Sequence, residues 1–314
     1  MRTMSHPLPA APVGGCTLRC YLLAMRLPFL LASAVPVALG WAAAHHDGHT
    51  MTLWIAVVTL LGALLAHAAT NVLNDGYDSD GDAINQGFVA PYTGGSRLIQ
   101  QGVLSEGQMR RYGYALLAAA ALCGLLLLSQ GGLWLWLVGL AGLLLGWAYS
   151  APPLALASRG LGELAAGLGV GTLIPLGSYL VQSGEPAWTP LLAGLPYVLL
   201  AANLLVINQF PDRVADEAVG KRHWVVRLGA RRGRWLYIGL ALSAWLSLPA
   251  MVLLEWLPAS VLLALPLALC SLLAARQLWR YAEQPQRLAG AIRYTIAALL
   301  GGGGLIALGL GLMP

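Results

Sequence analysis

Long apolar runs alternate with short polar connections along the whole chain. A bilayer-crossing helix needs about 20 mostly apolar residues, and nine runs meet this requirement. They lie at 18–44, 51–74, 109–129, 132–150, 161–182, 189–210, 233–253, 258–279 and 290–312. The pattern predicts an all-α, polytopic membrane protein with about nine transmembrane helices. We expect a single transmembrane helical domain over residues 1–314, of which residues 1–17 form an N-terminal tail.

The composition agrees with a chain embedded in lipid. Of the 314 residues, 58% are hydrophobic and only 10% are charged, whereas soluble domains carry about 25% charged residues. Glycine is frequent inside the apolar runs, which is typical of closely packed transmembrane helices. The composition therefore excludes a soluble globular protein and makes the lipid bilayer a partner of most of the chain.

Basic residues occur in alternate connections. The connections near 45–50, 129–132, 182–190 and 255–260 contain no Lys or Arg, while those between them hold most of the 18 basic residues. Cytoplasmic loops are enriched in Lys and Arg, so the N-terminus is expected in the cytoplasm and the C-terminus on the opposite side of the membrane. The membrane itself is expected to be the inner (cytoplasmic) membrane. Orientation accounts for the net charge of +5, and a nucleic-acid partner is not expected.

Asn-x-x-x-Asp-x-x-x-Asp occurs twice, at Asn74/Asp78/Asp82 and at Asn208/Asp212/Asp216. Each copy lies where an apolar run gives way to a polar connection, and both fall on the expected cytoplasmic side. We expect them in two motif loops, at 75–108 and 211–232. A spacing of four residues is about one helical turn, so each triad can share one helix face.

Clustered carboxylates at a membrane boundary are costly and repel one another. Seven of the thirteen acidic residues lie in the two motif segments, and neither triad contains Cys or His. Oxygen-only ligand sets favour hard cations, chiefly Mg²⁺, which typically binds one or two carboxylates together with substrate phosphates. Two opposing acidic faces would therefore hold Mg²⁺ and a diphosphate between them.

Other interpretations of the acidic residues fit less well. A calcium loop beginning at Asp78 should have Gly at its sixth position and Glu at its twelfth, but Ala83 and Val89 stand there. The Asp-Gly-x-x-Ala-Arg core of alcohol phosphatidyltransferases is absent. A cation transporter would place acids near the bilayer midplane, and solvated helix ends would not repeat the same triad.

The two motifs resemble the signatures of the UbiA superfamily of intramembrane aromatic prenyltransferases. Residues 71–82 are similar to its first signature, and residues 208–222, continued by 225–229, to its second. Tyr149–Pro153 followed by Arg159–Glu163 resembles the stretch that joins the family's fourth and fifth spans. The resemblance implies a UbiA-like bundle and a Mg²⁺-dependent transfer of a polyprenyl group from a polyprenyl diphosphate to an aromatic acceptor.

The resemblance also implies roles for individual residues. The metal-facing carboxylates would be Asp78, Asp82, Asp212 and Asp216. Asn74 and Asn208 would bind the diphosphate or orient the metal shell, and Asp75 would act in that shell or as a base for the acceptor. Positive charge for the leaving diphosphate would come from Arg97, Lys221 and Arg222. The rest of the expected substrate site is Asn71, Tyr149 and Glu163, although Glu163 also suits the first turn of a helix.

The segment after the first motif bears on the acceptor. Residues 93–105, beginning Thr-Gly-Gly-Ser-Arg, resemble the menaquinone-type 1,4-dihydroxy-2-naphthoate prenyltransferases. Members of that group often carry Arg just before the first Asp of motif two, where this chain has Pro211, so we expect a kink there. 1,4-Dihydroxy-2-naphthoate is the expected acceptor. The alternatives are 4-hydroxybenzoate, homogentisate and a specialised phenol.

Overall fold

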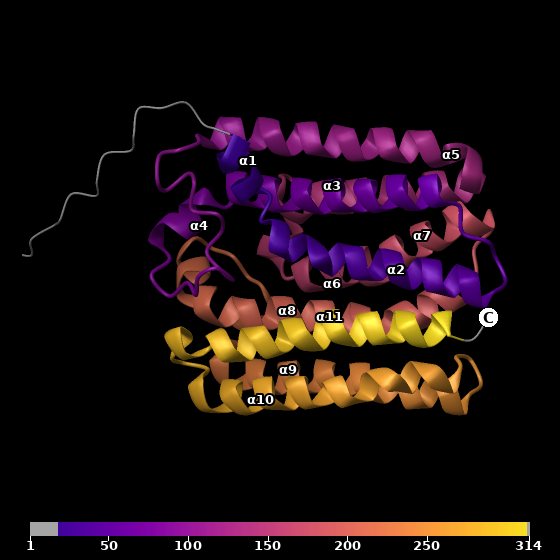
Figure 1. The fold of residues 1–314 in the computed structure, drawn as a ribbon. Helices are drawn as coiled ribbons and strands as arrows, with labels where there is room; N and C mark the ends of the chain where they lie inside the picture. The colour runs from indigo at the N-terminus through magenta and orange to yellow at the C-terminus, as the bar shows by residue number, and fades with distance from the viewer. Residues whose placement is uncertain (1–17, 313–314) are drawn as a thin grey trace, which may run out of the picture.

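A computed structural model describes residues 18–312, and every regular element in that part of the chain is helical (Figure 1). The predicted N-terminal tail at 1–17 lies outside the described residues. The α-helices are α1 (Leu18–Ala24), α2 (Leu31–His46), α3 (Leu53–Tyr77), α4 (Ser79–Ile84), α5 (Glu106–Ser150), α6 (Gly162–Leu168), α7 (Ile174–Ser183), α8 (Thr189–Ala218), α9 (Trp224–Leu253), α10 (Ala268–Tyr281) and α11 (Ala289–Gly311). Short 3-10 or π-helical segments are η1 (Leu27–Leu30), η2 (Leu156–Arg159), η3 (Gly169–Leu173), η4 (Ala259–Leu267) and η5 (Pro285–Arg287).

Eight continuous helical stretches among the described residues are long and apolar enough to cross a membrane. The all-α, multi-pass prediction is therefore confirmed. The predicted nine spans differ from these eight because α5, with 45 residues, includes a non-helical position at Gly132 (φ 51°, ψ −138°).

Two contacts show that α5 turns back on itself at Gly132. Near its start, a Cβ added at Gly76 of α3 would lie 2.9 Å from Cγ of Arg110. At its end, Ser150 Oγ accepts a hydrogen bond of 3.1 Å from Asn74 Nδ2. Both ends of α5 thus meet the same end of α3, so residues 106–131 and 133–150 form an antiparallel pair. These two halves correspond to the predicted spans 109–129 and 132–150.

Several predicted boundaries differ from the observed ones. The first run is interrupted at Arg26, whose left-handed backbone (φ 56°) precedes η1. Of the two motif segments predicted as loops, 211–232 is largely helical, since α8 continues to Ala218, and α9 begins at Trp224 with a break at Gly229 (φ 71°). The segment 75–108 contains the end of α3, the short helix α4 and the start of α5, and its residues 85–105 are not helical. Polar residues extend α8 because partners outside the helix satisfy their side chains, as described below.

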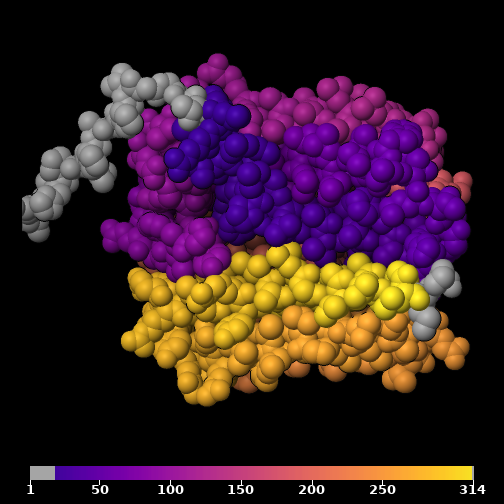
Figure 2. Space-filling model, viewed as in Figure 1, coloured from indigo at the N-terminus to yellow at the C-terminus, as the bar shows by residue number. Residues whose placement is uncertain are grey.

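The core brings the second half of the chain against α2. Tyr197 of α8 is fully buried and donates a hydrogen bond of 3.0 Å to the carbonyl of Ala32. A Cβ at Gly303 of α11 would lie 2.5 Å from the Tyr197 ring, so the absence of a side chain there permits this contact. In Figure 2, α11 in yellow lies between the indigo α2 and the orange α10. This packing fixes α8, which carries the second motif.

Candidate active site

The first motif spans two helices rather than one helix face. Asn74 lies in the last turn of α3, Asp78 is the residue at which that helix ends (φ −107°), and Asp82 belongs to α4. The prediction that this triad stacks along one helix is therefore wrong.

The second motif does lie along one helix. Asn208, Asp212 and Asp216 are one turn apart within α8, which continues through Pro211 without a non-helical residue. The kink expected from Pro211 is not present as a break in the helix. A Cβ added at Gly87 would lie 2.5 Å from the Pro211 carbonyl, so the segment after α4 packs directly on this part of α8.

The connection between α4 and α5 ties the two motifs together. Asn85 Nδ2 donates a 2.6 Å hydrogen bond to Asp212 Oδ1. The Arg97 guanidinium donates to the backbone carbonyl of Asp82, and Ser96 N donates a 2.9 Å bond to Asp75 Oδ2. These contacts place the first acidic segment beside α8.

Lys221 joins the two motifs directly. Its Nζ lies 2.7 Å from Asp216 Oδ1 and also donates to Asp78 Oδ2. The other oxygen of Asp216 accepts from His223 Nε2 at 3.1 Å. Val226 N donates to His223 Nδ1, so that nitrogen carries no proton and the proton of the neutral ring lies on Nε2. One carboxylate of the second motif is thus held by both a lysine and a histidine.

Burial dominates the electrostatics of the first motif. It raises the pKa of Asp78 to about 6, against the opposing effect of Lys221 and with further upward contributions from Asp216 and Asp75. Burial, followed by the charges of Asp78 and Asp75, raises the pKa of Asp82 to about 7. Although burial opposes its charged form, the two carboxylates hold the pKa of Lys221 above its ordinary value. The cluster has more negative charge than its one lysine balances.

Below the carboxylates lies a cavity of about 470 Å³. Its polar end includes Asp78, Asp212 and Lys221, and apolar residues such as Val58 and Leu127 line it further along the helices. Glycines of several helices also form its wall, which leaves room for a long apolar group. The cavity therefore combines a charged head region with an apolar extension, the shape that a lipid diphosphate requires.

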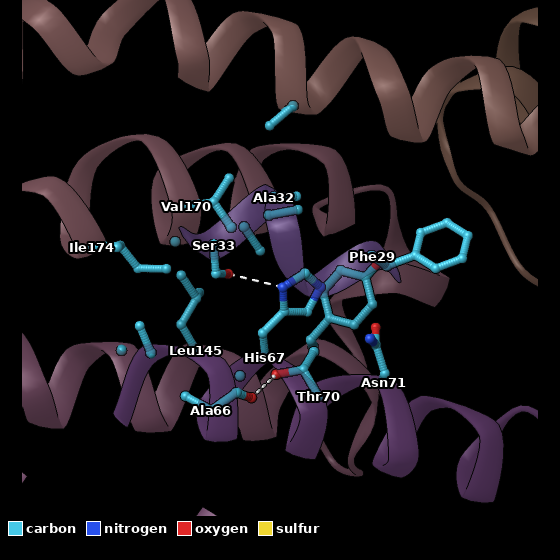
Figure 3. Close-up of a pocket in the computed structure, with 18 of the residues that line it drawn as sticks. Phe29, Ala32, Ser33, Ala66, His67, Thr70, Asn71, Leu145, Val170 and Ile174 are labelled. Carbon is cyan, nitrogen blue, oxygen red and sulfur yellow. Dashed lines mark hydrogen bonds between the residues drawn. The ribbon is translucent and has the colours of Figure 1, made fainter. Parts of the chain in front are cut away.

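Two ionisable residues of the cavity, which lie within the first and second apolar runs, were not predicted as site residues. His67 of α3 accepts or donates a 2.8 Å hydrogen bond through Nδ1 with Ser33 Oγ of α2 (Figure 3). Arg26 also lines the cavity, stacks on Phe29 and donates to the Tyr92 carbonyl at 3.1 Å. An ionisable residue inside an apolar span is itself a signal of a functional site, and this signal was present for both.

Most of the predicted site residues line this one cavity. These are Asn71, Asn74, Asp78, Asp82, Tyr149, Asn208, Asp212, Asp216 and Lys221. They come from four helices and from the connection that follows α8, and are separated by up to 150 residues in the sequence. The structure thus brings together both motifs and the tyrosine that was expected beside them.

Four predicted residues lie outside the cavity wall. Asp75 is buried beneath the connection at Ser96, and Arg97 supports Asp82 through its backbone. Glu163 is fully buried and accepts hydrogen bonds of 2.9 Å from Gln209 Nε2 and 2.8 Å from Trp224 N, so it joins α6 to α8 and α9.

Arg222 is the fourth residue outside the wall. Its side chain is exposed, and its backbone N–H donates to the Ser158 carbonyl at 2.7 Å. Of the three cations expected to face a diphosphate, the geometry therefore leaves only Lys221 inside the cavity.

The residues at the polar end fit a hard divalent cation. Four carboxylates and the amide of Asn208 supply only oxygen donors that such ions favour. Asn208 Oδ1 is buried and has no hydrogen-bond partner among the described residues. In residues 18–312, no group of three or more His, Cys, Asp or Glu side chains is arranged to hold an ion alone. A cation here would need ligand oxygens as well, as Mg²⁺ does when it binds with substrate phosphates.

Fold and site together define a multi-pass helical membrane protein with an acidic, lysine-bridged cavity that extends between its spans. Residues 30–309 match the UbiA prenyltransferase family. The chain belongs to this family, and the protein is a prenyltransferase.

Among curated relatives, a 2-carboxy-1,4-naphthoquinone phytyltransferase of Synechocystis is 28% identical over 291 residues, which cover 91% of each chain. A 1,4-dihydroxy-2-naphthoate octaprenyltransferase of Mycobacterium tuberculosis is 30% identical over 244 residues, covering 77% of this chain and 81% of that one. These similarities support the predicted closeness to the menaquinone-type members.

Solved structures share the fold. A UbiA homolog from Aeropyrum pernix aligns with a TM-score of 0.70 at 19% identity, covering 91% of this chain and 98% of that one. A UbiA homolog from Archaeoglobus fulgidus, solved bound to DMAPP and Mg²⁺, aligns with a TM-score of 0.65 at 20% identity, covering 89% and 98%. At these identities the comparison shows the helical architecture.

Proposed function

We propose that the protein transfers a polyprenyl group from a polyprenyl diphosphate to a hydroxylated aromatic acid, in a Mg²⁺-dependent reaction. The observation that carries this proposal is the meeting of both Asn/Asp motifs at the mouth of an apolar cavity. The diphosphate lies among the carboxylates and Lys221, and the prenyl chain extends along the glycine-rich wall. Asp78, Asp82, Asp212 and Asp216 hold the metal, and Asn74 and Asn208 complete the polar wall.

The residues of the site favour departure of the diphosphate. When the bond between prenyl C1 and the diphosphate oxygen breaks, both electrons leave with the diphosphate and an allylic cation remains. Bound Mg²⁺ supplies positive charge to the leaving oxygens. Lys221 adds a further cation at the same end. Tyr149 lines the cavity, and its aromatic ring would stabilise the allylic cation through its π face.

The acceptor proposed is 1,4-dihydroxy-2-naphthoate, in the biosynthesis of menaquinone. A ring carbon of the acceptor forms the new bond to C1, and the ring then loses a proton or its carboxylate as CO₂. Arg26 and His67 give the cavity wall a cation and a hydrogen-bonding imidazole, which suit the carboxylate and hydroxyls of such an acid. The similarity to two naphthoate prenyltransferases and the Thr93–Ser105 segment support this choice.

The reaction is proposed to take place at the cytoplasmic side of the inner membrane. The basic residues of the alternate connections support this orientation. Both motifs lie at one end of their helices, beside α4 and the connections that carry these residues (Figure 1).

The test is turnover by the purified protein with Mg²⁺, octaprenyl diphosphate and a panel of aromatic acids, read by mass spectrometry. We expect a prenylated product from 1,4-dihydroxy-2-naphthoate, with loss of the carboxylate mass. Product from 4-hydroxybenzoate or homogentisate instead would replace the proposed acceptor. No product from any acceptor, with a folded protein, would contradict the proposed reaction.

A further inference from the structure

Lys221 occupies the position between the two motifs where a metal cation is expected. Its ammonium contacts one carboxylate from each motif, Asp78 and Asp216, and the side chains of the three residues are only 14%, 20% and 11% exposed. A buried ion pair of this kind satisfies charges that would otherwise be unpaired. The protein therefore already carries a cation of its own between these two carboxylates.

The backbone that carries Lys221 is fixed, while its side chain is long and flexible. Lys221 N donates to the Asp216 carbonyl at 2.9 Å, and the next residue, Arg222, is bonded through its own N–H to the Ser158 carbonyl at 2.7 Å. Gly220 (φ 81°) reverses the chain just before it. A lysine ammonium on a four-carbon stem can exchange partners by rotation of side-chain bonds alone.

A diphosphate changes the balance of charge around this ammonium. The carboxylates alone do not form a complete cation site in the described part of the chain, and Lys221 already pairs two of them. A diphosphate offers Lys221 a strongly anionic partner and offers a divalent cation the oxygens that the protein lacks. Ligand and metal therefore favour the same rearrangement of one side chain.

We propose that Lys221 makes metal binding conditional on the diphosphate. Its ammonium holds Asp78 and Asp216 until a diphosphate draws it away, and the carboxylates then bind the metal together with the diphosphate. This role deepens the proposed function, since it assigns an order of binding to the same site. By linkage, the diphosphate must raise the affinity for the metal by the same factor by which the metal raises the affinity for the diphosphate.

Two simpler roles for Lys221 predict different behaviour. If Lys221 only binds phosphate, its removal leaves the affinity for a metal ion unchanged when no diphosphate is present. If Lys221 only ties the motifs together, its removal loosens the site and weakens metal binding. The proposed exchange predicts that removal of the ammonium strengthens binding of the metal by itself.

The first experiment measures Mn²⁺ binding to the detergent-purified protein by electron paramagnetic resonance, with no diphosphate present. We expect Lys221→Met to bind Mn²⁺ about tenfold more tightly than the wild type, a typical size for such coupling. Lys221→Arg, which keeps the charge, should resemble the wild type. Arg231→Met removes a charge from an exposed side chain outside the cavity and is the matched control. Equal or weaker binding by folded Lys221→Met would overturn the proposal.

A second experiment uses the unmodified protein. Lys221 is the only lysine of the 314 residues, so growth on lysine labelled with ¹³C at Cε gives a single NMR signal from this side chain. We expect the signal to shift when inorganic diphosphate and Mg²⁺ are added together, and to stay in place with the same concentration of Mg²⁺ alone. A shift with Mg²⁺ alone, or no shift with both, would contradict partner exchange. Neither experiment requires turnover, so absence of prenyl transfer would be seen separately.

Discussion

Asp78 and Asp212 belong to different motifs and line the same cavity, so each should be indispensable. Replacement of either by Ala removes a carboxylate from the metal site, and we expect turnover to fall roughly 100-fold or more. Asp80→Asn is a suitable control, because Asp80 is exposed and lies outside the cavity wall. Steady-state turnover with octaprenyl diphosphate measures the effect. Full activity of either alanine variant would remove that residue from the metal site.

The raised pKa values of the first motif predict how Mg²⁺ stabilises the protein at different pH. Burial raises the pKa of Asp78 to about 6 and of Asp82 to about 7, from 3.8. Without metal, the stability that the neutral acids contribute is complete below pH 3.8 and is lost as the pH rises through these values. Mg²⁺ binds the ionised forms, so it should raise the melting temperature more at pH 8 than at pH 5.5.

Thermal unfolding in detergent in the presence of inorganic diphosphate, with and without Mg²⁺ at both pH values, measures this difference. Asp82→Asn should reduce it, because one of the two titrating acids is absent. An equal gain in melting temperature at both pH values would show that these carboxylates do not control metal binding.

The amino-acid sequence predicted a group of carboxylates that the structure places around one cavity, but it did not predict their hydrogen-bond partners. Asn208, Asp212 and Asp216 are close in the sequence and share a helix, so their spacing predicted their arrangement. The contact of Lys221 with Asp78 joins positions 143 residues apart, and no local pattern encodes such a distance. The local sequence around Glu163 likewise suits either a first-turn acid or a site residue. Its place outside the cavity wall follows from the packing of α6, α8 and α9.

The backbone of the connection between α4 and α5 should be essential for the position of the first motif. Gly95 has φ +70°, and a Cβ added there would lie 2.4 Å from Asp82 Oδ2 and 3.0 Å from Asp75 Oδ1. Gly95→Ala must therefore displace the first motif, and we expect loss of turnover and of Mn²⁺ binding.

Gly102 provides the matched control for that substitution. It has the same φ of +70°, but an added Cβ would meet nothing within 4 Å. Gly102→Ala should cost only about 1–2 kcal/mol for the left-handed backbone, measurable as a lower unfolding temperature, with metal binding retained. Equal loss of Mn²⁺ binding in both variants would show that backbone strain, and not contact with Asp82, is responsible.

The apolar runs predicted which segments are helices, because a segment buried in lipid must satisfy its backbone internally. They predicted the start of α8 and the end of α9, but not where α8 ends or where α9 begins. Polar residues of α8 remain helical beyond the apolar run, since Lys221, His223 and Asn85 satisfy them. Arg26 interrupts the first run, and an apolar pattern does not reveal such a left-handed residue.

At the scale of the whole bundle, glycines in the cavity wall leave space for the prenyl chain of the substrate. A large side chain in that space should limit the protein to shorter prenyl chains. Gly142 lines the cavity, and a Cβ there would meet nothing within 4 Å. It lies two turns from Tyr149, about 10 Å along the helix. We expect Gly142→Phe to lower kcat/KM for octaprenyl diphosphate at least about tenfold, which corresponds to 1.4 kcal/mol, with little change for geranyl diphosphate.

Gly239→Phe is the control for this substitution. Gly239 of α9 is exposed, has no atom within 4 Å of an added Cβ and does not line the cavity. A series of prenyl diphosphates of increasing length measures the preference. An unchanged preference in Gly142→Phe would place the prenyl chain elsewhere in the bundle.

The turn at Gly132 has a consequence for sidedness. As one straight helix, the 45 residues of α5 would be about 68 Å long, more than twice the roughly 30 Å thickness of a bilayer's hydrocarbon core. Because α5 folds back, it crosses the bilayer twice. The chain therefore makes an even number of crossings between the first motif and the second, and both motifs lie on the same face of the membrane. A single glycine between two halves of one helix thus decides that the two acidic triads share a compartment.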